Sequence, residues 1–181
     1  ELRRFGRVRQ PWVGADVASS AVDTFLLRTV VRRVAEGSPA DDAGLREGDV
    51  LVSVGENRID GPMDWEVALL DAGVGSRVEV RYNRDGRTRT ASMRVEEPPS
   101  ERAERVDVLQ GLQLVTVTEQ IALERGLQVR RGALIVDLSD EVARATRMRE
   151  GDVILAVNRR EAATAEDAAA LFQQASGRGL V

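Results

Sequence analysis

Apolar and polar residues follow several short patterns between residues 38 and 97. Val50–Val54 is a short aliphatic run beside turn residues, which predicts a buried strand. After Gly61-Pro62, an apolar cluster predicts a helix with two contacting faces, made of Trp65, Val67, Ala68, Leu69 and Leu70 and ended by Gly73. The stretches SRVEVRY and RTRTASMRVE alternate, and residues 83–86 between them include Asp-Gly, so they predict a hairpin.

A one-turn helix is predicted just before the Val50–Val54 strand. Ser38 is expected to cap its N-terminus, and Pro39 to take the first helical position, where no N–H partner is needed. Gly44 is expected to end this helix in a left-handed conformation. The Gly48-Asp49 pair then predicts a turn in which the Asp side chain bonds nearby amides.

The pentapeptide Arg-Glu-Gly-Asp-Val occurs twice, starting at Arg46 and at Arg149. Sliding the sequence on itself by this interval extends the match, and both copies read as short helix, Gly-Asp turn, aliphatic strand, polar turn and second helix. Arg147 replaces Gly44 in the second copy, so its capping must differ, starting from Ser139 or Asp140. We interpret the pattern as two copies of one domain, in which the repeated Gly-Asp has an architectural role.

The Pro98-Pro99 pair lies in a charged stretch with few apolar residues and marks a domain boundary. We predict a first domain over residues 10–97, a linker over 98–105 and a second domain over 106–181. At the repeat interval, residues 179–181 correspond to the start of the first hairpin strand. The second domain is therefore expected to lack its last strands.

Composition limits the possible chemistry. The chain has 43% hydrophobic and 31% charged residues, which suits a globular protein, and no apolar run approaches the roughly 18 residues of a membrane helix. It contains no His and no Cys, so the usual general base, thiol nucleophile and commonest metal ligands are missing. We predict no catalytic residue, no metal site and no cofactor. A net charge of −4 argues against a nucleic-acid partner.

Two segments resemble a known family. EGSPADDAGLREGDVLVSVGENRI resembles the central signature of a bacterial PDZ domain, and MREGDVILAVNRREA resembles a degenerate second one. The opening ELRRFGRVRQPWVGADV is similar to the segment that joins the trypsin-like protease domain to the first PDZ domain in HtrA/Deg-type serine proteases. The resemblance implies an α+β fold of two tandem PDZ domains, each a small, partly open β-barrel or sandwich flanked by two helices. Residues 1–9 would be a connector from an upstream protease domain, consistent with a chain that begins at Glu1 without Met.

PDZ domains bind peptide C-termini by adding the ligand as a strand to a sheet edge beside a helix. In the first domain the resemblance assigns the carboxylate-binding loop to Trp12, Val13, Gly14 and Ala15, with Arg7 and Arg9 adding positive potential. The pairing strand would be residues 15–17, including Val17, and the groove-facing helix positions would be Pro62, Glu66 and Leu69, with Leu70 beside them. The alternative is that Trp12 and Val13 belong to the core and that Arg7 and Arg9 form a solvated connection.

In the second domain the equivalent loop would be Gln110, Gly111 and Leu112. The pairing strand would be residues 112–115, including Leu114, and the helix would offer Ala165, Ala169 and Phe172. Because polar Gln110 replaces the usual apolar residue, we expect weaker peptide binding here, and a packing or assembly role is left open.

The resemblance implies a peptide-binding regulatory module of an HtrA-like serine endopeptidase. It would dock C-termini of misfolded or cleaved proteins in the bacterial envelope or periplasm, and so deliver substrate or activate the protease. The parent is expected to form a homo-oligomer, a trimer or larger. The alternatives are a structural or oligomerisation module of the same protease or of a protease-dead homologue, and the paired PDZ domains of a site-2 membrane protease.

Overall fold

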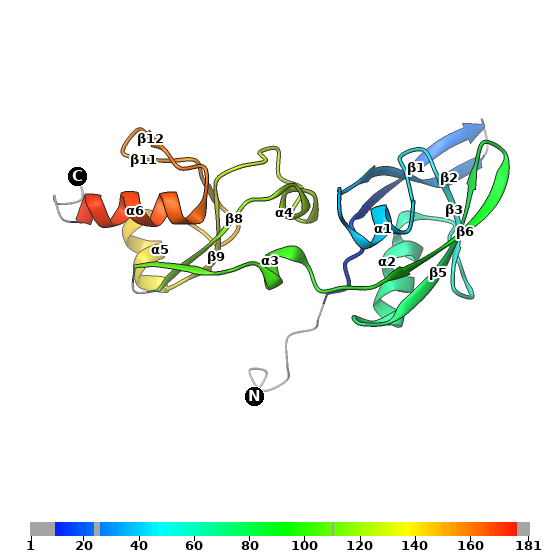
Figure 1. Cartoon of the computed structure of the whole chain (residues 1–181), viewed down its shortest axis with the longest axis horizontal. Helices are drawn as coiled ribbons and strands as arrows, with labels where there is room; N and C mark the ends of the chain where they lie inside the picture. Colours follow the sequence, from blue (N-terminus) through cyan, green and yellow to red (C-terminus); the bar gives the residue numbers. More distant parts are fainter. Residues whose placement is uncertain (1–9, 24–25, 110, 177–181) are drawn as a thin grey trace. The chain divides into compact units, whose positions relative to one another are not determined.

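The computed structural model describes residues 10–23, 26–109 and 111–176, and the chain divides into two compact units, Glu1–Pro98 and Pro99–Val181. Figure 1 shows the two units along the chain. The predicted connector over residues 1–9, with Arg7 and Arg9, lies outside the described residues, as do Gln110 and residues 179–181.

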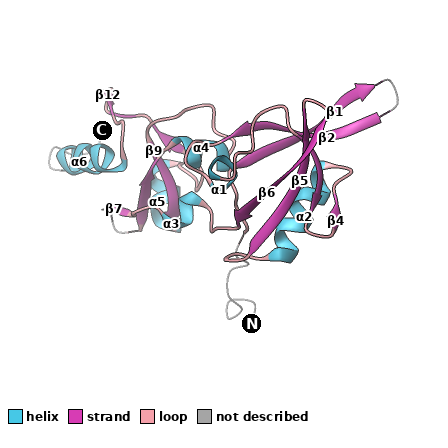
Figure 2. Cartoon of the chain, turned by 45° about the vertical axis from the view of Figure 1, so that its right-hand side comes forward, coloured by secondary structure: helices cyan, strands magenta, loops and turns pink. Residues whose placement is uncertain are grey.

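The first unit is an antiparallel sheet with two helices (Figure 2). Its elements are β1 (Ala15–Asp23), β2 (Leu26–Val34), α1 (Pro39–Asp42), β3 (Val50–Val54), β4 (Asn57–Arg58), α2 (Pro62–Ala72), β5 (Arg77–Arg84) and β6 (Arg87–Arg94). The strand order is β1-β2-β3-β5-β6, with β4 paired to β3. The predicted helices, strand and hairpin are all present, and β5 and β6 meet at a two-residue turn, Asp85-Gly86, where both residues have positive φ.

Helix α2 packs against the core with one face rather than two. Trp65, Ala68 and Leu69 are buried, whereas Val67 and Leu70 are 47% and 49% exposed. The prediction of two contacting faces was therefore wrong, because apolar side chains at nearly every position of a short segment do not show which of them meet the sheet. The buried face joins a core that includes Val31, Leu51, Val80 and Val95.

The Gly48-Asp49 turn behaves as expected. Gly48 has φ +89°, and the Asp49 carboxylate accepts a hydrogen bond of 2.8 Å from the Arg46 amide. Asp49 is 1% exposed and is also held by Arg84, whose Nε and Nη2 donate to its two carboxylate oxygens at 2.6 and 2.7 Å. Arg84 Nη2 also donates to the Gly44 carbonyl, so one guanidinium ties the end of β5 to the turn. This hydrogen bonding raises the pKa of Arg84.

The second unit has a smaller sheet and more helices. Its elements are α3 (Pro99–Arg102), β7 (Val106–Leu109), β8 (Leu112–Thr116), α4 (Glu119–Glu124), β9 (Ala133–Leu138), α5 (Asp140–Thr146), β10 (Val153–Ile154), β11 (Ala156–Val157), β12 (Arg160–Glu161) and α6 (Ala165–Ser176). The strand order is β10-β9-β8-β7, and β11 and β12 form a separate pair. Two flanking helices were expected, but α3 and α4 accompany α5 and α6.

Helix α3 lies in the stretch predicted as a linker. The Ser100 amide and hydroxyl both donate to the Glu124 carboxylate at the end of α4, and Arg125 Nη2 donates to the Ser100 hydroxyl at 2.7 Å. Ser100 is 2% exposed. These bonds make α3 part of the second unit.

Local geometry at the repeated pentapeptide is the same in both units. Gly151 has φ +91°, and Asp152 accepts a hydrogen bond of 2.8 Å from the Arg149 amide, as Asp49 does from Arg46. Ser139 caps α5 by accepting from the Val142 amide, and Arg147 ends that helix at φ +61°. The predicted cap is therefore present, and Arg147 takes the conformation that Gly44 takes in the first unit.

One part of the repeat differs. The aliphatic run Val50–Val54 is one strand, but its counterpart is divided into β10 and β11 around Leu155, which is 45% exposed. In the first unit β5 pairs with β3 along this run. In the part of the second unit that the structure describes, β10 pairs with β9 alone, so no second neighbour keeps the run extended.

Candidate functional site

The segment from Trp12 to Ala15 enters the sheet of the first unit as a tight loop. Trp12 forms a two-way backbone bridge with Glu96, at 2.8 and 2.9 Å, and both Trp12 and Val13 are buried. The Val13 carbonyl accepts from the Ala40 amide at the start of α1. Trp12 and Val13 thus contribute to packing, and at these two positions only the backbone is available for binding.

Gly14 is required by both conformation and space. Its φ is +80°, and its carbonyl accepts a hydrogen bond of 2.8 Å from the Ala35 amide. A Cβ at this position would lie 2.2 Å from Ser38 Cβ and 2.4 Å from Ser38 Oγ. Ser38 is itself fixed because its hydroxyl caps α1 by accepting from the Asp41 amide. The loop can therefore lie against the helix cap only with Gly at this position.

Three successive amides of this loop are free for a ligand. In the described part of the chain the N–H groups of Val13 and Gly14 donate no hydrogen bond. Ala15 pairs with Val34 next to the hydrogen-bonded Gly14–Ala35 position, so its N–H points away from β2. Amides in a buried loop normally have a partner, and successive free amides form an anion-binding nest.

Strand β1 provides an open sheet edge beside this loop. It is the first strand in the order and pairs only with β2 among the described strands. Helix α2 lies next to β1, and Ala15 and Val17 are half-buried against the same core as Leu69. The predicted pairing strand is longer than expected, since β1 continues to Asp23. We define the β1–α2 groove as the strip of surface bounded by the open edge of β1 and by α2.

The helix residues predicted for the groove have different environments. Leu69 is buried, Pro62 is half-buried, and Glu66 and Leu70 are exposed. The pKa of the Glu66 carboxyl is raised. The larger cause is desolvation, because the protein covers part of the carboxyl, and the smaller cause is the negative charge of Asp16. Asp16 belongs to β1, so the charge of a strand residue acts on an acid of the helix at this groove.

The second unit repeats the loop geometry. Gly111 has φ +87°, its carbonyl accepts from the Ser139 amide at 2.7 Å, and a Cβ there would lie 2.6 Å from Ser139 Cβ. Gly111 thus corresponds to Gly14, and Ser139 to Ser38. Strand β8 accordingly corresponds to β1. The Leu112 and Leu114 side chains are buried, together with Ala165, Ala169 and Phe172 of α6.

The edge of β8 differs from that of β1. Strand β7 pairs with β8 on the side away from β9, in the register Val106↔Leu114, Asp107↔Gln113 and Leu109↔Leu112. Five of the residues predicted for the second groove lie in one core, namely Leu112, Leu114, Ala165, Ala169 and Phe172. Strand β7, however, lies along the strand to which a peptide would add. The sequence reasoning missed this pairing, the close contact of Ser38 with Gly14, and the effect of Asp16 on Glu66. No shared spacing signals this contact, because Gly14 and Ser38 are 24 residues apart whereas Gly111 and Ser139 are 28 residues apart.

Other kinds of site find no support in the described residues. They contain no group of three or more acidic side chains arranged to hold a metal ion. No helix among them has the length and apolar character needed to cross a membrane.

Comparison with known proteins agrees with the geometry of the first unit. Residues 11–95 match the family model of the PDZ domain, from the loop at Trp12 to the end of β6. The first unit is therefore a PDZ domain.

Curated relatives connect this chain with serine proteases. A probable periplasmic serine endoprotease, DegP-like, from Chlamydia trachomatis is 30% identical over 156 residues, covering 84% of this chain and 31% of the relative. Serine protease Do-like HtrA from Lactococcus lactis is 36% identical over 72 residues, covering 40% of this chain and 18% of the relative. The chain thus spans about a third or less of these relatives. Among solved structures, the HtrA-type protease AlgWS227A with decapeptide matches with a TM-score of 0.48 and 20% identity, over 54% of this chain and 32% of that one.

Proposed function

We propose that the first unit binds the free C-terminus of an extended peptide in the β1–α2 groove. The observation that supports this most directly is the combination of an open β1 edge with free amides at Val13, Gly14 and Ala15. The terminal carboxylate would accept from the loop amides, and the peptide main chain would pair with β1. The last side chain would lie over Ala15, Val17 and Leu69, which favours an apolar residue.

Binding of a short fluorescent peptide to the whole chain tests this proposal. The peptide ends in valine, and its twin is identical except for a C-terminal amide. Hydrogen bonds to a charged group contribute about 1.5–3 kcal/mol, so amidation should weaken binding about 10- to 100-fold. Hydrogen exchange should locate the protection at residues 12–23. Equal affinity for the two peptides would count against the carboxylate loop.

A matched pair of variants separates the groove from general stability. Leu69→Val and Leu51→Val each remove one methylene group from the same core, but only Leu69 lies on the α2 side of the groove. We expect Leu69→Val to change the preference for the last side chain towards larger residues, and Leu51→Val to leave it unchanged. An equal change in both variants would assign the effect to folding.

We further propose that the chain is the regulatory part of an HtrA-like serine endopeptidase of the bacterial envelope, and that the second unit is a second PDZ-like copy. The relatives named as periplasmic serine endoproteases support the first part, and the repeated Gly–Ser contact supports the second. In this role the first unit would bring C-termini of misfolded or cleaved proteins to a protease domain. A trypsin-like domain with an intact His-Asp-Ser triad in the sequence before Glu1 is the expected result. A metal-binding membrane domain there would point to a site-2 protease instead.

A further inference from the structure

Strand β7 occupies in the second unit the place that a bound peptide would occupy in the first. The Gly–Ser contacts make β8 the counterpart of β1 and β9 the counterpart of β2. The side of β8 that faces away from β9 is therefore the counterpart of the open edge of β1. Strand β7 pairs along this side, antiparallel to β8.

We call the place between β8 and α6 that β7 occupies the slot. Strand β8 forms one side of it, and α6, the counterpart of α2, forms the other. Strand β7 lies against α6. Val108 is 8% exposed and belongs to the same core as Leu112, Ala169 and Phe172. The N-terminus of α6 is fixed to the end of β8, since the Thr116 hydroxyl accepts from the Ala165 amide at 2.9 Å and donates to Glu166. Val108 thus fills the apolar space between strand and helix.

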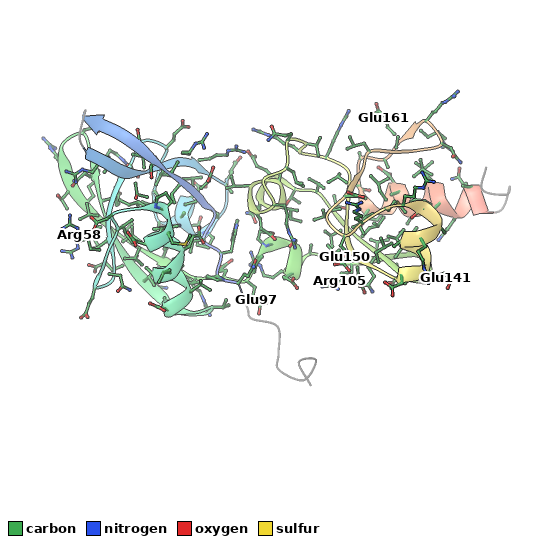
Figure 3. All side chains as sticks on the ribbon, turned by 180° about the vertical axis from the view of Figure 1, so that it is seen from behind. Arg58, Glu97, Arg105, Glu141, Glu150 and Glu161 are labelled. Carbon is green, nitrogen blue, oxygen red and sulfur yellow. The ribbon has the colours of Figure 1, made fainter. Side chains whose placement is uncertain are left out.

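The opposite face of β7 is polar and also held in place. Gln113 Nε2 donates to the Asp107 carboxylate at 2.9 Å, and Arg105 Nη1 donates to the side-chain Oε1 of Gln113 at 3.1 Å. Arg105 lies directly before β7, and Figure 3 labels its side chain. One side chain buried towards the helix and its neighbour bonded on the other side is the alternation that a strand ligand shows at a sheet edge.

The direction of β7 also matches that of a C-terminal ligand. It runs antiparallel to β8, and Leu109 pairs with Leu112, directly beside the Gly111 loop. A peptide added antiparallel at this edge has its last residue at that loop. Residues 106–109, Val-Asp-Val-Leu, therefore have the pattern and orientation of an apolar C-terminal peptide.

We propose that β7 is a built-in ligand of the second unit, which accepts an external strand only after β7 has left the slot. A segment joined to its site by a short turn has an effective concentration of the order of millimolar or above. A free peptide with the same intrinsic affinity must therefore exceed millimolar concentration to compete. The external ligand would be an extended peptide with apolar residues at alternate positions and at its end. This inference rests on the proposal that the second unit is a PDZ-like copy, and its readout at β8 is separate from the readout at β1.

The test uses the whole chain and the peptide Arg-Val-Asp-Val-Leu, with hydrogen exchange read at residues 112–116 and 133–138. Val108→Asp places a charge in the apolar slot and should release β7, and Asp107→Ala is the control on the opposite face of the strand. We expect the affinity for the peptide, measured from the protection of β8, to be at least tenfold higher in Val108→Asp than in the parent or in Asp107→Ala. If Val108→Asp unfolds the second unit, millimolar peptide should restore its protection.

The chain has no Cys, so an introduced pair provides a lock. In Asp107→Cys/Gln113→Cys, oxidation joins β7 to β8, and β8 should then be unable to bind peptide even at millimolar concentration. Reduction should restore the parent behaviour. The proposal is wrong if the parent binds this peptide at β8 as tightly as Val108→Asp does, if peptide neither binds nor refolds that variant, or if the oxidised chain still binds. Because exchange at β1 is recorded separately, a failure here is distinct from a failure of the first groove.

Discussion

Gly14→Ala is the substitution that most directly tests the loop of the first unit. It adds one methyl group at a position where the Cβ would lie 2.2 Å from Ser38 Cβ. The methyl group has no space unless Ser38 moves, and Ser38 cannot move without losing its bond to the Asp41 amide. The φ of +80° is also unfavourable for any residue with a Cβ.

The expected loss has three parts. A left-handed backbone at an L-residue costs about 1–2 kcal/mol. Overpacking against Ser38 costs about 1–3 kcal/mol, and a lost N-cap about 1 kcal/mol. Gly14→Ala should therefore lower the free energy of unfolding of the first unit by about 3–6 kcal/mol, of which about 2–4 kcal/mol depends on Ser38.

Two further variants separate these parts. Gly44 has φ +81° and no heavy atom within 4 Å of an added Cβ. Gly44→Ala should therefore lower the free energy of unfolding by only about 1–2 kcal/mol, the cost of the left-handed backbone. Ser38→Gly removes the side chain that the new methyl group would meet, and by itself it should lower the free energy of unfolding by roughly a few tenths of a kcal/mol. In the double variant Gly14→Ala/Ser38→Gly, about 2 kcal/mol or more of the loss should be recovered.

Urea unfolding followed by tryptophan fluorescence measures this cycle in the intact chain. The two Trp residues, Trp12 and Trp65, both lie in the first unit, so the signal reports on that unit alone. The reasoning is refuted if the two single losses add in the double variant. It is equally refuted if Gly14→Ala costs no more than Gly44→Ala.

Two other predictions concern charged groups of the first unit. Arg84→Met leaves the buried Asp49 carboxylate without its cation and should lower the free energy of unfolding by about 3 kcal/mol in the same urea assay. Adding Asp49→Asn should recover part of this loss. A loss below about 1 kcal/mol would contradict the role of the pair. The raised pKa of Glu66 means that the folded unit keeps this proton at higher pH than the unfolded chain does, so the parent loses stability as pH rises above the ordinary value of 4.5. Glu66→Gln should therefore unfold at higher urea concentration than the parent at pH 7, with the difference narrowing at pH 3, and a parent that is the more stable at pH 7 would contradict the assignment.

The elements that local signals define were predictable from the sequence. Ser38-Pro39 placed the start of α1, Gly61-Pro62 the start of α2, and Asp85-Gly86 the hairpin turn, because capping and turn residues act within a few positions of themselves. Helix α4 carries such a cap too, Thr118, but its single short turn lies in a stretch for which the first copy has no counterpart. The repeat therefore gave no indication of it.

Contacts between distant segments were not predictable in the same way. The exposure of Val67 and Leu70 depends on where the sheet lies relative to α2, and that position is set by strands elsewhere in the chain. The contact of Gly14 with Ser38 likewise joins a loop to a helix cap across β1 and β2. A single sequence contains both residues of such a contact but does not show that they meet.

The two units together distinguish what this loop does for the fold from what it does for binding. Gly14 with Ser38 and Gly111 with Ser139 make the same close contact, yet β1 has an open edge and β8 is paired with β7. A feature present in both states cannot by itself decide whether a peptide binds. The Gly–Ser contact therefore belongs to the fold, because it seats the end of a strand against a helix cap. In the binding mode proposed above, access to the strand would depend instead on its second neighbour, which no pattern within the strand itself encodes.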